Sequence, residues 1–567
     1  MIIPTCKILV LASLLASGTE SHIIPFGILH SRDIDYSSSS SLAQQRFGSF
    51  RLAGLEEYFK KHNEPFTNFE DLNKKLFKAR GKTMGEDYNH DRFEKIPYQE
   101  IRDNYYVPKG NYAHLHFNAY LPSIDGGKQA KDWESDLDEL EKADDADSES
   151  YKPFALDTIY TKLKESGKKP FEATKAFEDS MEAAGKDYGD LVDFTSFSKD
   201  QIPLKDRADK TWPQFQALTS KFKGPFEYEW MWRYYLKALF RDWNHHKILH
   251  GELRHVFLND ILWNEQGKKL SGLDGSKQML QVVHDEVEIA KKLYPDFVGA
   301  KVIYCIPRMF KLTEDEAKKQ KETKPFYQPA WNIQEHDRYI ELAKWQAQQN
   351  MFVLAAFDIV GREDKDTDAS GLTFYNNRHF KAELVRLLKN APEGTRNLSL
   401  HAGEAIDMSP DAAARVNMEM LAELAEEFRD SLMRGGDLVG LEHDSDTSGD
   451  QSTADVMKSF ESTNVAAELC PVSNEGLGTA LTAVDGADRF QTKIMLHLYT
   501  SVSGDDPTFF GLEPALELAY MMVGSEAMTL YRLVALAFMS INSSYMTQKE
   551  IERAYDITIE QVKAIDF

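Results

Sequence analysis

Short apolar segments that end in polar or charged residues alternate with helical stretches along most of this chain, beginning near Val107. Such alternation is typical of parallel β/α units. Eight segments are candidate strands: 111–116, 248–257, 300–308, 352–361, 397–404, 437–443, 466–474 and 499–506. Eight units predict an α/β fold, a TIM (β/α) eight-stranded barrel, in which functional residues lie at the carboxyl ends of the strands.

The remaining chain surrounds this barrel in a predictable way. Amphipathic patterns at 50–61 and 69–80 predict a leader and helical N-terminal region over 20–105, before a barrel spanning 106–567. The first two candidate strands are separated by about 130 residues, where an ordinary unit needs roughly 30. We therefore expect a long insertion at 124–225, whose acidic start lacks the spacing of a calcium loop and reads as a solvated excursion.

The N-terminus has the pattern of a secretory signal peptide. Lys7 precedes an apolar run from Ile8 to about Ala16, and small residues follow. The run is shorter than the roughly 20 apolar residues that a membrane span requires. We predict a signal peptide at 1–19, an extracellular location and no membrane span.

Cysteines and sequons add limited information about the secretory route. The chain has three cysteines, and without Cys6 of the signal peptide only Cys305 and Cys470 remain, too few for a disulfide framework. Cys470 is expected to be a buried structural thiol, because no activating partner is evident. Asn-x-Ser/Thr sequons at Asn397 and Asn542 fit a secreted glycoprotein, although such triplets also occur by chance.

The formal net charge of −24 at pH 7 argues against nucleic-acid partners, because a polyanion is repelled over most of such a surface. A neutral small molecule meets no such penalty. The charge therefore favours a small, uncharged substrate.

Two segments place histidines at predicted strand ends. In AHLHF, His114 and His116 are two residues apart in a strand, so both imidazoles project from one face. In LSLHAGE, an apolar strand ends at His401, and Glu404 follows a glycine turn. An HxH pair alone is more often an ordinary core or surface pair.

A third segment, SVSGDDP, ends a strand with the neighbouring carboxylates Asp505 and Asp506. Like charges so close together need compensation, and a metal or a proton transfer supplies it. Three histidines and one aspartate are ligands that zinc favours, and they leave room for a water whose pKa zinc lowers toward about 7. Two-metal hydrolases instead use a bridging lysine on the fourth strand, where AAFDIVGRED has none, so we predict one zinc per chain.

The motifs also occur in the order of a known family. PKG and HLH within 108–116, FDIVG at 357–361, HAGE at 401–404, LCPVSN at 469–474 and GDDP at 504–507 together resemble adenosine deaminases. The PKG lead-in, the CPVSN segment, the signal peptide and the insertion are similar to the secreted adenosine deaminase-related growth factors in particular. The resemblance covers about residues 105–530.

This resemblance implies roles for individual residues. His114, His116, His401 and Asp505 are implied as the zinc ligands. Glu404 is implied to share a proton with the purine nitrogen beside the attacked carbon, and the backbone N–H of Gly361 to bind the ring on its other side.

Three further positions complete the implied site. Asp506 is implied to bind the imidazole part of the purine and to orient the attacking hydroxide. His443 is implied as the base toward the zinc water or as a stabiliser of its charge. Asn118 occupies the place where many relatives carry an aspartate that reaches ribose hydroxyls.

The predicted function is thus zinc-dependent hydrolytic deamination of adenosine, or a related 6-aminopurine nucleoside, to inosine and ammonia outside the cell. The resemblance also implies a homodimer formed partly by the N-terminal helices, and no redox cofactor. GLEHDSD around His443 departs from the family pattern. That departure keeps open a secreted binding or growth-factor-like protein with weak or no catalysis, or a deaminase for another aminated base.

Overall fold

The barrel and its surrounding helices are well described in the computed structural model. It describes residues 108–117, 212, 215, 226, 229–257, 262–264, 268–310, 315, 318, 330–363, 373–404, 413–436, 451–463, 465–471, 473–474, 498–507 and 530–563. The predicted signal peptide, the leader and helical region at 20–105 and nearly all of the insertion lie outside these residues.

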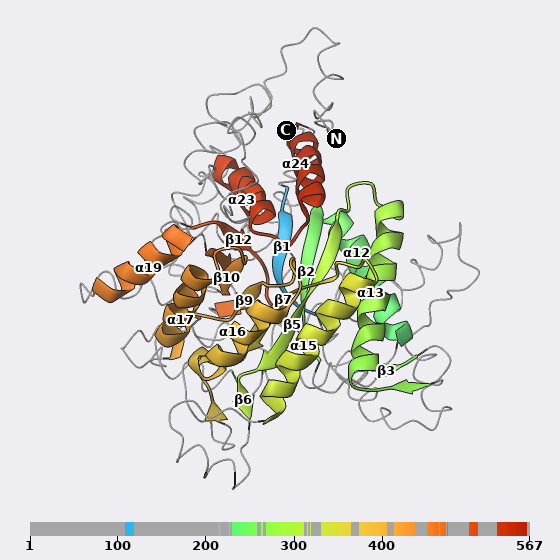
Figure 1. The fold of residues 1–567 in the computed structure, drawn as a ribbon. Helices are drawn as coiled ribbons and strands as arrows, with labels where there is room; N and C mark the ends of the chain where they lie inside the picture. The colour runs from blue at the N-terminus through green and yellow to red at the C-terminus, as the bar shows by residue number, and fades with distance from the viewer. Residues whose placement is uncertain are drawn as a thin grey trace, which may run out of the picture.

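Eight parallel strands follow one another around the sheet in chain order. They are β1 (Gly110–His116), β2 (Ile248–Val256), β5 (Gly299–Pro307), β7 (Leu354–Val360), β9 (Leu398–Leu400), β10 (Met433–Gly436), β11 (Ala466–Leu469) and β12 (Thr500–Val502). The last strand returns to the first through a parallel bridge between Leu115 and Asp505, where the His116 amide donates to the Asp505 carbonyl at 3.0 Å. The predicted eight-stranded β/α barrel is therefore confirmed (Figure 1).

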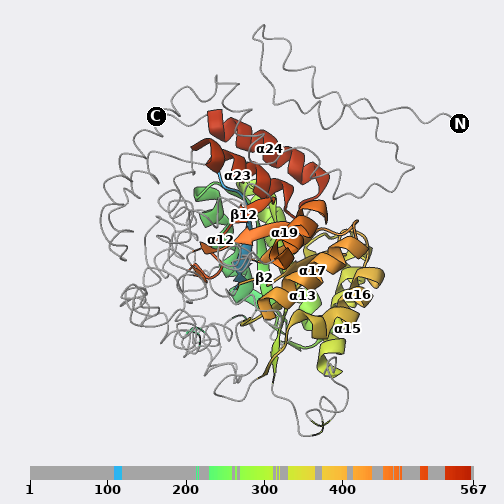
Figure 2. The same cartoon turned by 90° about the vertical axis from the view of Figure 1, so that its left-hand side faces the viewer.

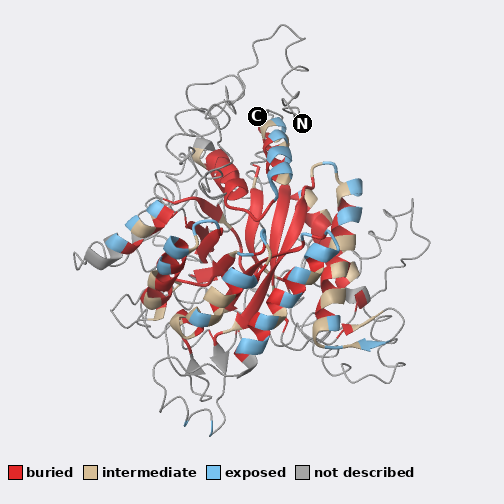
Figure 3. Ribbon diagram, viewed as in Figure 1, coloured by how far each residue is buried: buried red, intermediate tan, exposed pale blue. Residues whose placement is uncertain are grey.

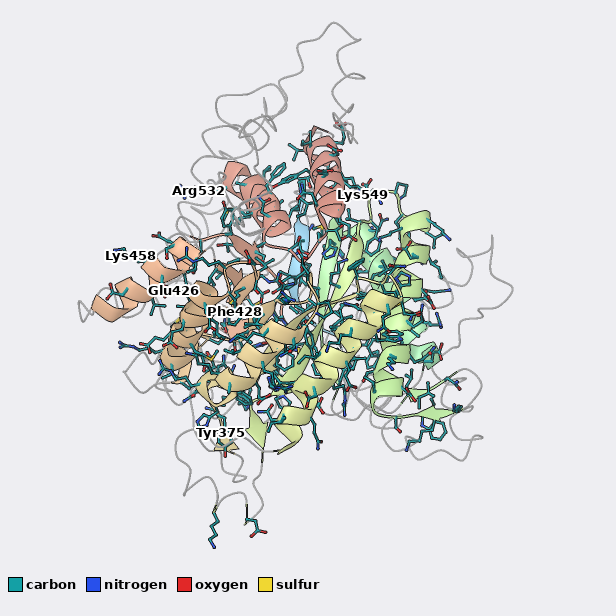
Figure 4. All side chains as sticks on the ribbon, in the orientation of Figure 1. Tyr375, Glu426, Phe428, Lys458, Arg532 and Lys549 are labelled. Atoms are coloured by element: carbon teal, nitrogen blue, oxygen red, sulfur yellow. The ribbon has the colours of Figure 1, made fainter. Side chains whose placement is uncertain are left out.

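Helices surround the strands, as Figures 1 and 2 show. They are α12 (Glu229–His245), α13 (Leu273–Leu293), α15 (Ala330–Gln348), α16 (Lys381–Asn390), α17 (Ala413–Glu427), α19 (Gln451–Thr463), α23 (Leu530–Asn542) and α24 (Gln548–Lys563). The strands are buried and the outer helix faces are exposed (Figure 3). Charged side chains such as Glu426, Lys458 and Lys549 lie at this periphery (Figure 4).

The sixth strand begins earlier in the chain than the sequence predicts. We predicted it at 437–443, but β10 covers Met433–Gly436, and 437–443 lies outside the described residues. Gly435 and Gly436 resemble a turn in the sequence. In the barrel, however, Arg434 pairs with Ser399 on one side and with Ala466 on the other, so neighbouring strands supply the hydrogen bonds that hold it extended.

The amino ends of the strands are covered by the chain between α23 and α24. The Tyr545 amide donates to Glu252 Oε1 at 2.8 Å, and its hydroxyl donates to the Leu398 carbonyl at 2.8 Å. Its ring lies 4.0 Å from the Arg434 guanidinium carbon. Substrate chemistry is therefore directed to the opposite, carboxyl end of the barrel.

Cys305 and Cys470 are both buried and form no disulfide among the described residues, and the buried position of Cys470 is as expected. The two sequons of the predicted glycoprotein differ in their surroundings. Asn542 is buried and accepts a hydrogen bond from Tyr555. Asn397 is half-buried, and its side-chain amide donates to the Ala355 carbonyl at 2.9 Å.

Within the part of the chain that the structure describes, no helix is long and apolar enough to cross a bilayer.

Candidate metal centre

An irregularity in β1 directs its histidines into the barrel. Between Tyr112 and Leu115 the strand advances three residues, while its partner β2 advances only from Gly251 to Leu253. An extra residue of this kind re-aims the side chains that follow it. His114 and His116 consequently face the same side, with ring centroids 5.3 Å apart.

The segment after β12 is fastened to β1 by three hydrogen bonds. The His114 amide donates to Ser503 Oγ at 3.2 Å, and the Gly504 amide donates to the Tyr112 hydroxyl oxygen at 2.6 Å. A Cβ at Gly504 would lie only 2.3 Å from that oxygen, so a side chain is excluded there. The third bond joins His116 to Asp505, whose φ of 58° is left-handed. Non-glycine residues in this conformation often mark functional sites.

Four predicted residues come together at the carboxyl ends of three strands. One ligand-type atom from each of His114, His116, His401 and Asp505 lies within 4.8 Å of every other. The His401 ring centroid is 4.9 Å from that of His114 and 5.4 Å from that of His116. Strands far apart in the sequence thus place three imidazoles and one carboxylate around a common point.

The donor atoms of this cluster fit a divalent cation. His114 Nε2 and Asp505 Oδ1 are buried and lack a hydrogen-bond partner among the described residues, although they are 3.2 Å apart. Their separation is short, but their orientation is not that of a hydrogen bond. A buried unpaired nitrogen and carboxylate oxygen are costly unless an ion compensates them, and three nitrogens with one oxygen suit zinc.

Two buried carboxylates orient the histidines. His114 Nδ1 lies 3.2 Å from Glu468 Oε2, and His401 Nδ1 lies 2.9 Å from Asp358 Oδ2. A carboxylate at Nδ1 holds the proton on that nitrogen and leaves Nε2 free to bind a metal. Our sequence reasoning missed both carboxylates. The available signal was an acidic residue inside an otherwise apolar strand, in AAFDIVG and in AAELC.

The electrostatics keep these carboxylates ionised. Burial opposes ionisation of Asp358, but His401 and Arg254 hold its pKa below the usual range. Burial likewise opposes ionisation of Glu468, whose pKa is lowered by Arg254 and Arg434. Burial lowers the pKa of His401 to about 4 despite the neighbouring Asp358. His401 is therefore neutral near pH 7, as a metal ligand must be.

The other two histidines respond differently to the carboxylate between them. Burial lowers the pKa of His116, against the opposing effect of Asp505. For His114, burial and Arg254 lower the pKa, but Asp505 and Glu468 prevail and raise it to about 9. Binding of a cation in place of this proton would satisfy the same carboxylates.

Glu363 fixes the loop that joins His401 to Glu404 by accepting hydrogen bonds from its amides. Glu363 Oε2 accepts from the amides of Gly403 at 2.8 Å and Glu404 at 2.7 Å. Arg308 donates to Glu363 Oε1 at 3.1 Å and to the His401 carbonyl at 2.8 Å. Glu404 Oε1 then lies 3.6 Å from His401 Nε2, at the edge of the candidate metal centre.

Two more predicted residues lie at this end of the barrel. Gly361 follows β7 with a φ of 123°, and a Cβ there would lie 3.1 Å from Arg308 Cγ, so glycine suits both the backbone and the space. Next to it, Arg362 lies 6.0 Å from the ring of Trp212, a residue of the insertion. Asp506 is buried, and its burial and the charge of Asp505 raise its pKa well above the usual range.

Asn118 and His443, the two remaining site predictions, lie outside the described residues. The structure therefore groups five of the nine predicted positions: His114, His116, His401, Glu404 and Asp505. Gly361 follows β7 and Asp506 follows β12, at the carboxyl ends of their strands.

Fold and cluster together define a parallel β/α barrel with a buried candidate metal centre at the carboxyl ends of its strands. No family model matches the chain. The chain is similar to curated proteins named adenosine deaminase. One from Phlebotomus duboscqi is 25% identical over 365 residues, covering 62% of this chain and 58% of the relative. Another, from Lutzomyia longipalpis, is 23% identical over 358 residues, covering 60% of this chain and 56% of the relative.

The match thus spans less than two thirds of each relative, and it confirms the resemblance to adenosine deaminases that the motifs indicated.

The structure of this chain also overlaps in part with solved structures. An adenine deaminase from Arthrobacter aurescens is 14% identical, with a TM-score of 0.44 over 81% of this chain and 100% of that chain. The apo structure of an N6-methyl-AMP deaminase from Arabidopsis thaliana is also 14% identical, with a TM-score of 0.45 over 82% and 98%. The barrel described above rests on this chain's own strand order and registers.

Proposed function

We propose that this protein is an extracellular zinc-dependent hydrolase that converts adenosine, or a related 6-aminopurine nucleoside, to inosine and ammonia. The convergence of His114, His116, His401 and Asp505 on one point carries the proposal, because this donor set fits one zinc ion. Similarity to proteins named adenosine deaminase supports the choice of substrate.

When bound, zinc would lower the pKa of a water toward about 7 and so provide a nucleophile at neutral pH. The three histidines and Asp505 would hold the ion. Glu468 and Asp358 would keep the ligand nitrogens of His114 and His401 directed at it.

The purine would be held on the same side of the barrel. Glu404 would donate a proton to the ring nitrogen next to the attacked carbon, which makes that carbon more electrophilic. The Gly361 N–H would bind the opposite ring edge. Asp506 would bind the imidazole part of the purine, and the raised pKa of its carboxyl favours the protonated form that donates to a ring nitrogen.

His443 would complete the site as the base toward the attacking water, and Asn118 would face the ribose. Trp212 of the predicted insertion at 124–225 lies 6.0 Å from Arg362, next to Gly361, so this residue would lie near the purine. The signal peptide at 1–19, the helical region at 20–105 and a homodimer belong to the same proposal.

The test uses the full secreted chain, with zinc content and turnover of a panel of 6-aminopurine nucleosides measured on one preparation. We expect about one zinc per chain and conversion of adenosine to inosine, followed by absorbance. Glu404→Gln should retain zinc and fold but lose roughly 100-fold or more in kcat. Exposed Glu426→Gln is the matched control and should leave kcat unchanged.

Absence of zinc-dependent turnover of every nucleoside on the panel would overturn the proposal. If zinc nevertheless binds stoichiometrically, the binding or growth-factor-like alternative becomes the better reading.

A further inference from the structure

We propose that Arg254 is a positioning residue that locks the carboxylates behind two of the candidate metal ligands, and thereby sets the affinity of the site for its metal. This inference rests on the proposed function only through the metal centre. Among the described residues, the hydrogen bonds and ion pairs of Arg254 go to Asp358, Glu468 and Ser399, and none goes to a candidate metal ligand. Arg254 acts through Asp358 and Glu468.

The two arms of the Arg254 guanidinium reach different carboxylates. Its Nη1 pairs with Asp358 Oδ2, and its Nη2 pairs with Glu468 Oε2. At Glu468 this is the oxygen that faces the histidine, since Oε2 lies 3.2 Å from His114 Nδ1. At Asp358 both oxygens face His401 Nδ1, Oδ2 at 2.9 Å and Oδ1, which makes the hydrogen bond, at 3.1 Å. One side chain thus fixes the partner oxygens of ligands that come from β1 and from the end of β9.

Ser399 completes the arrangement from β9. Arg254 Nη1 donates to the Ser399 carbonyl at 2.9 Å, and Nη2 donates to Ser399 Oγ at 2.8 Å. The Ser399 hydroxyl in turn donates to Glu468 Oε1 at 2.8 Å. All of these side chains are buried, so water does not substitute for a lost contact.

The geometry at position 254 requires an arginine, because the side chain must contact two carboxylates at once. A planar guanidinium presents several N–H donors in a rigid fork, whereas a lysine ammonium is a compact point charge. A lysine at 254 would keep the positive charge but lose simultaneous contact with both carboxylates. Each carboxylate would then be freer to rotate away from its histidine.

The first test compares Arg254→Lys with Arg434→Lys in the full chain. Arg434 is an equally buried arginine that also spans two carboxylates, Glu252 and Glu468. It meets Glu468 at Oε1 rather than at the oxygen that faces His114, and it stacks on Tyr545 at the closed end. Loss of a buried fork and of one contact to Glu468 is therefore common to both variants, but only Arg254→Lys also frees Asp358 and the Glu468 oxygen that faces His114.

Zinc affinity is measured by competition with a chelator, and the ligand environment by the visible spectrum of protein loaded with Co²⁺. For Arg254→Lys we expect the zinc dissociation constant to rise about 10- to 100-fold, with a changed Co²⁺ spectrum. Arg434→Lys leaves Asp358 and Glu468 Oε2 in contact with Arg254, so it should raise the zinc dissociation constant by clearly less and keep a spectrum closer to that of the wild type, even if its thermal stability falls.

Ser399→Ala keeps the inference testable if Arg254→Lys does not fold. It removes one small hydroxyl that Arg254 and Glu468 share, and we expect a smaller rise in the zinc dissociation constant. Wild-type zinc affinity and an unchanged Co²⁺ spectrum in whichever of these variants folds would overturn the inference, as would an equal loss in Arg434→Lys. If the wild-type protein itself binds neither zinc nor Co²⁺, the proposed function fails as well. Failure of the inference alone leaves metal binding by the wild type intact, so the two failures are distinguishable.

Discussion

Glu363 shows how one buried carboxylate can determine the shape of a loop, here the loop that carries Glu404. Its two oxygens accept from the amides of Gly403 and Glu404 on one side and from Arg308 and Asn417 on the other. Gly403 has a φ of 92°, a conformation open to glycine at little cost. Both Glu363 oxygens are needed as acceptors, because a backbone amide left without a partner in this place costs about 1–3 kcal/mol.

On the proposed function, we therefore expect Glu363→Gln to lower the turnover of adenosine while the zinc content stays that of the wild type. The glutamine NH₂ must face either the loop amides or Arg308, and both are donors. Displacement of Glu404 by about 1 Å is enough to cost roughly 100-fold in rate. Zinc should remain, because Arg308 and Asn377 still hold the His401 carbonyl. Steady-state kinetics and metal analysis on the same sample check this.

The control for Glu363→Gln is Glu419→Gln on α17, where the carboxylate pairs with Arg415 and Arg378 nearer the surface. Exposed pairs of this kind contribute little. Unchanged kcat in Glu363→Gln, or loss of zinc together with activity, would contradict the positioning role.

At the scale of elements, α24 is tied to the base of the barrel through its first turn. Thr547 and Glu550 form a reciprocal cap, in which the Thr547 amide donates to Glu550 Oε2 at 2.8 Å and the Glu550 amide donates to Thr547 Oγ1 at 3.3 Å. The same carboxylate lies 3.2 Å from Lys301 on β5. Burial opposes ionisation of Glu550, but Lys301 and His250 hold its pKa at about 2.

This pKa predicts the pH dependence of the stability contributed by Glu550. Its folded pKa of about 2 is lower than the ordinary glutamate value of 4.5, so the folded state favours the ionised form. The stabilisation is fully present above pH 4.5 and is lost as pH falls through about 2. Glu550→Gln keeps the cap but not the charge. We expect it to lower the free energy of unfolding by about 1–3 kcal/mol at pH 7, and to match wild type below pH 2.

Urea unfolding from pH 7 to pH 2 measures this difference, with exposed Glu552→Gln on the same helix as control. A deficit that stays constant across the whole range would contradict the ionic origin of the stabilisation.

How far the sequence predicts this molecule depends on whether a feature is local. The apolar strand ends that carry His114, His116, His401 and Asp505 are local patterns, and the barrel topology brings them together. The partner of a buried charge, in contrast, cannot be predicted from a local pattern. Nothing near Arg254 in the sequence specifies Asp358, which lies 104 positions away.

The start of the sixth strand at Met433 was missed for the same reason, because hydrogen bonds from the strands on both sides override the turn-like pair at Gly435 and Gly436.

At the scale of the whole molecule, the candidate metal centre lies where the barrel closes. β1 pairs with β2 along its length, but it meets β12 through a single isolated bridge at Leu115 and Asp505. His114 and His116 belong to β1, and Asp505 follows β12. A metal held by both sides would therefore reinforce a junction at which few backbone groups pair.

Removal of the metal should consequently destabilise the entire barrel. A ligand that binds only the folded state adds about 2.7 kcal/mol at a free concentration 100 times its dissociation constant. We expect chelation to lower the thermal unfolding temperature of the wild type and added zinc to restore it. Asp505→Asn should lose most of this zinc-dependent increment, while its backbone keeps the φ of 58° that asparagine tolerates. Exposed Asp430→Asn should keep the full increment. An unfolding temperature that does not respond to chelation in the wild type would show that the metal does not hold the closure together.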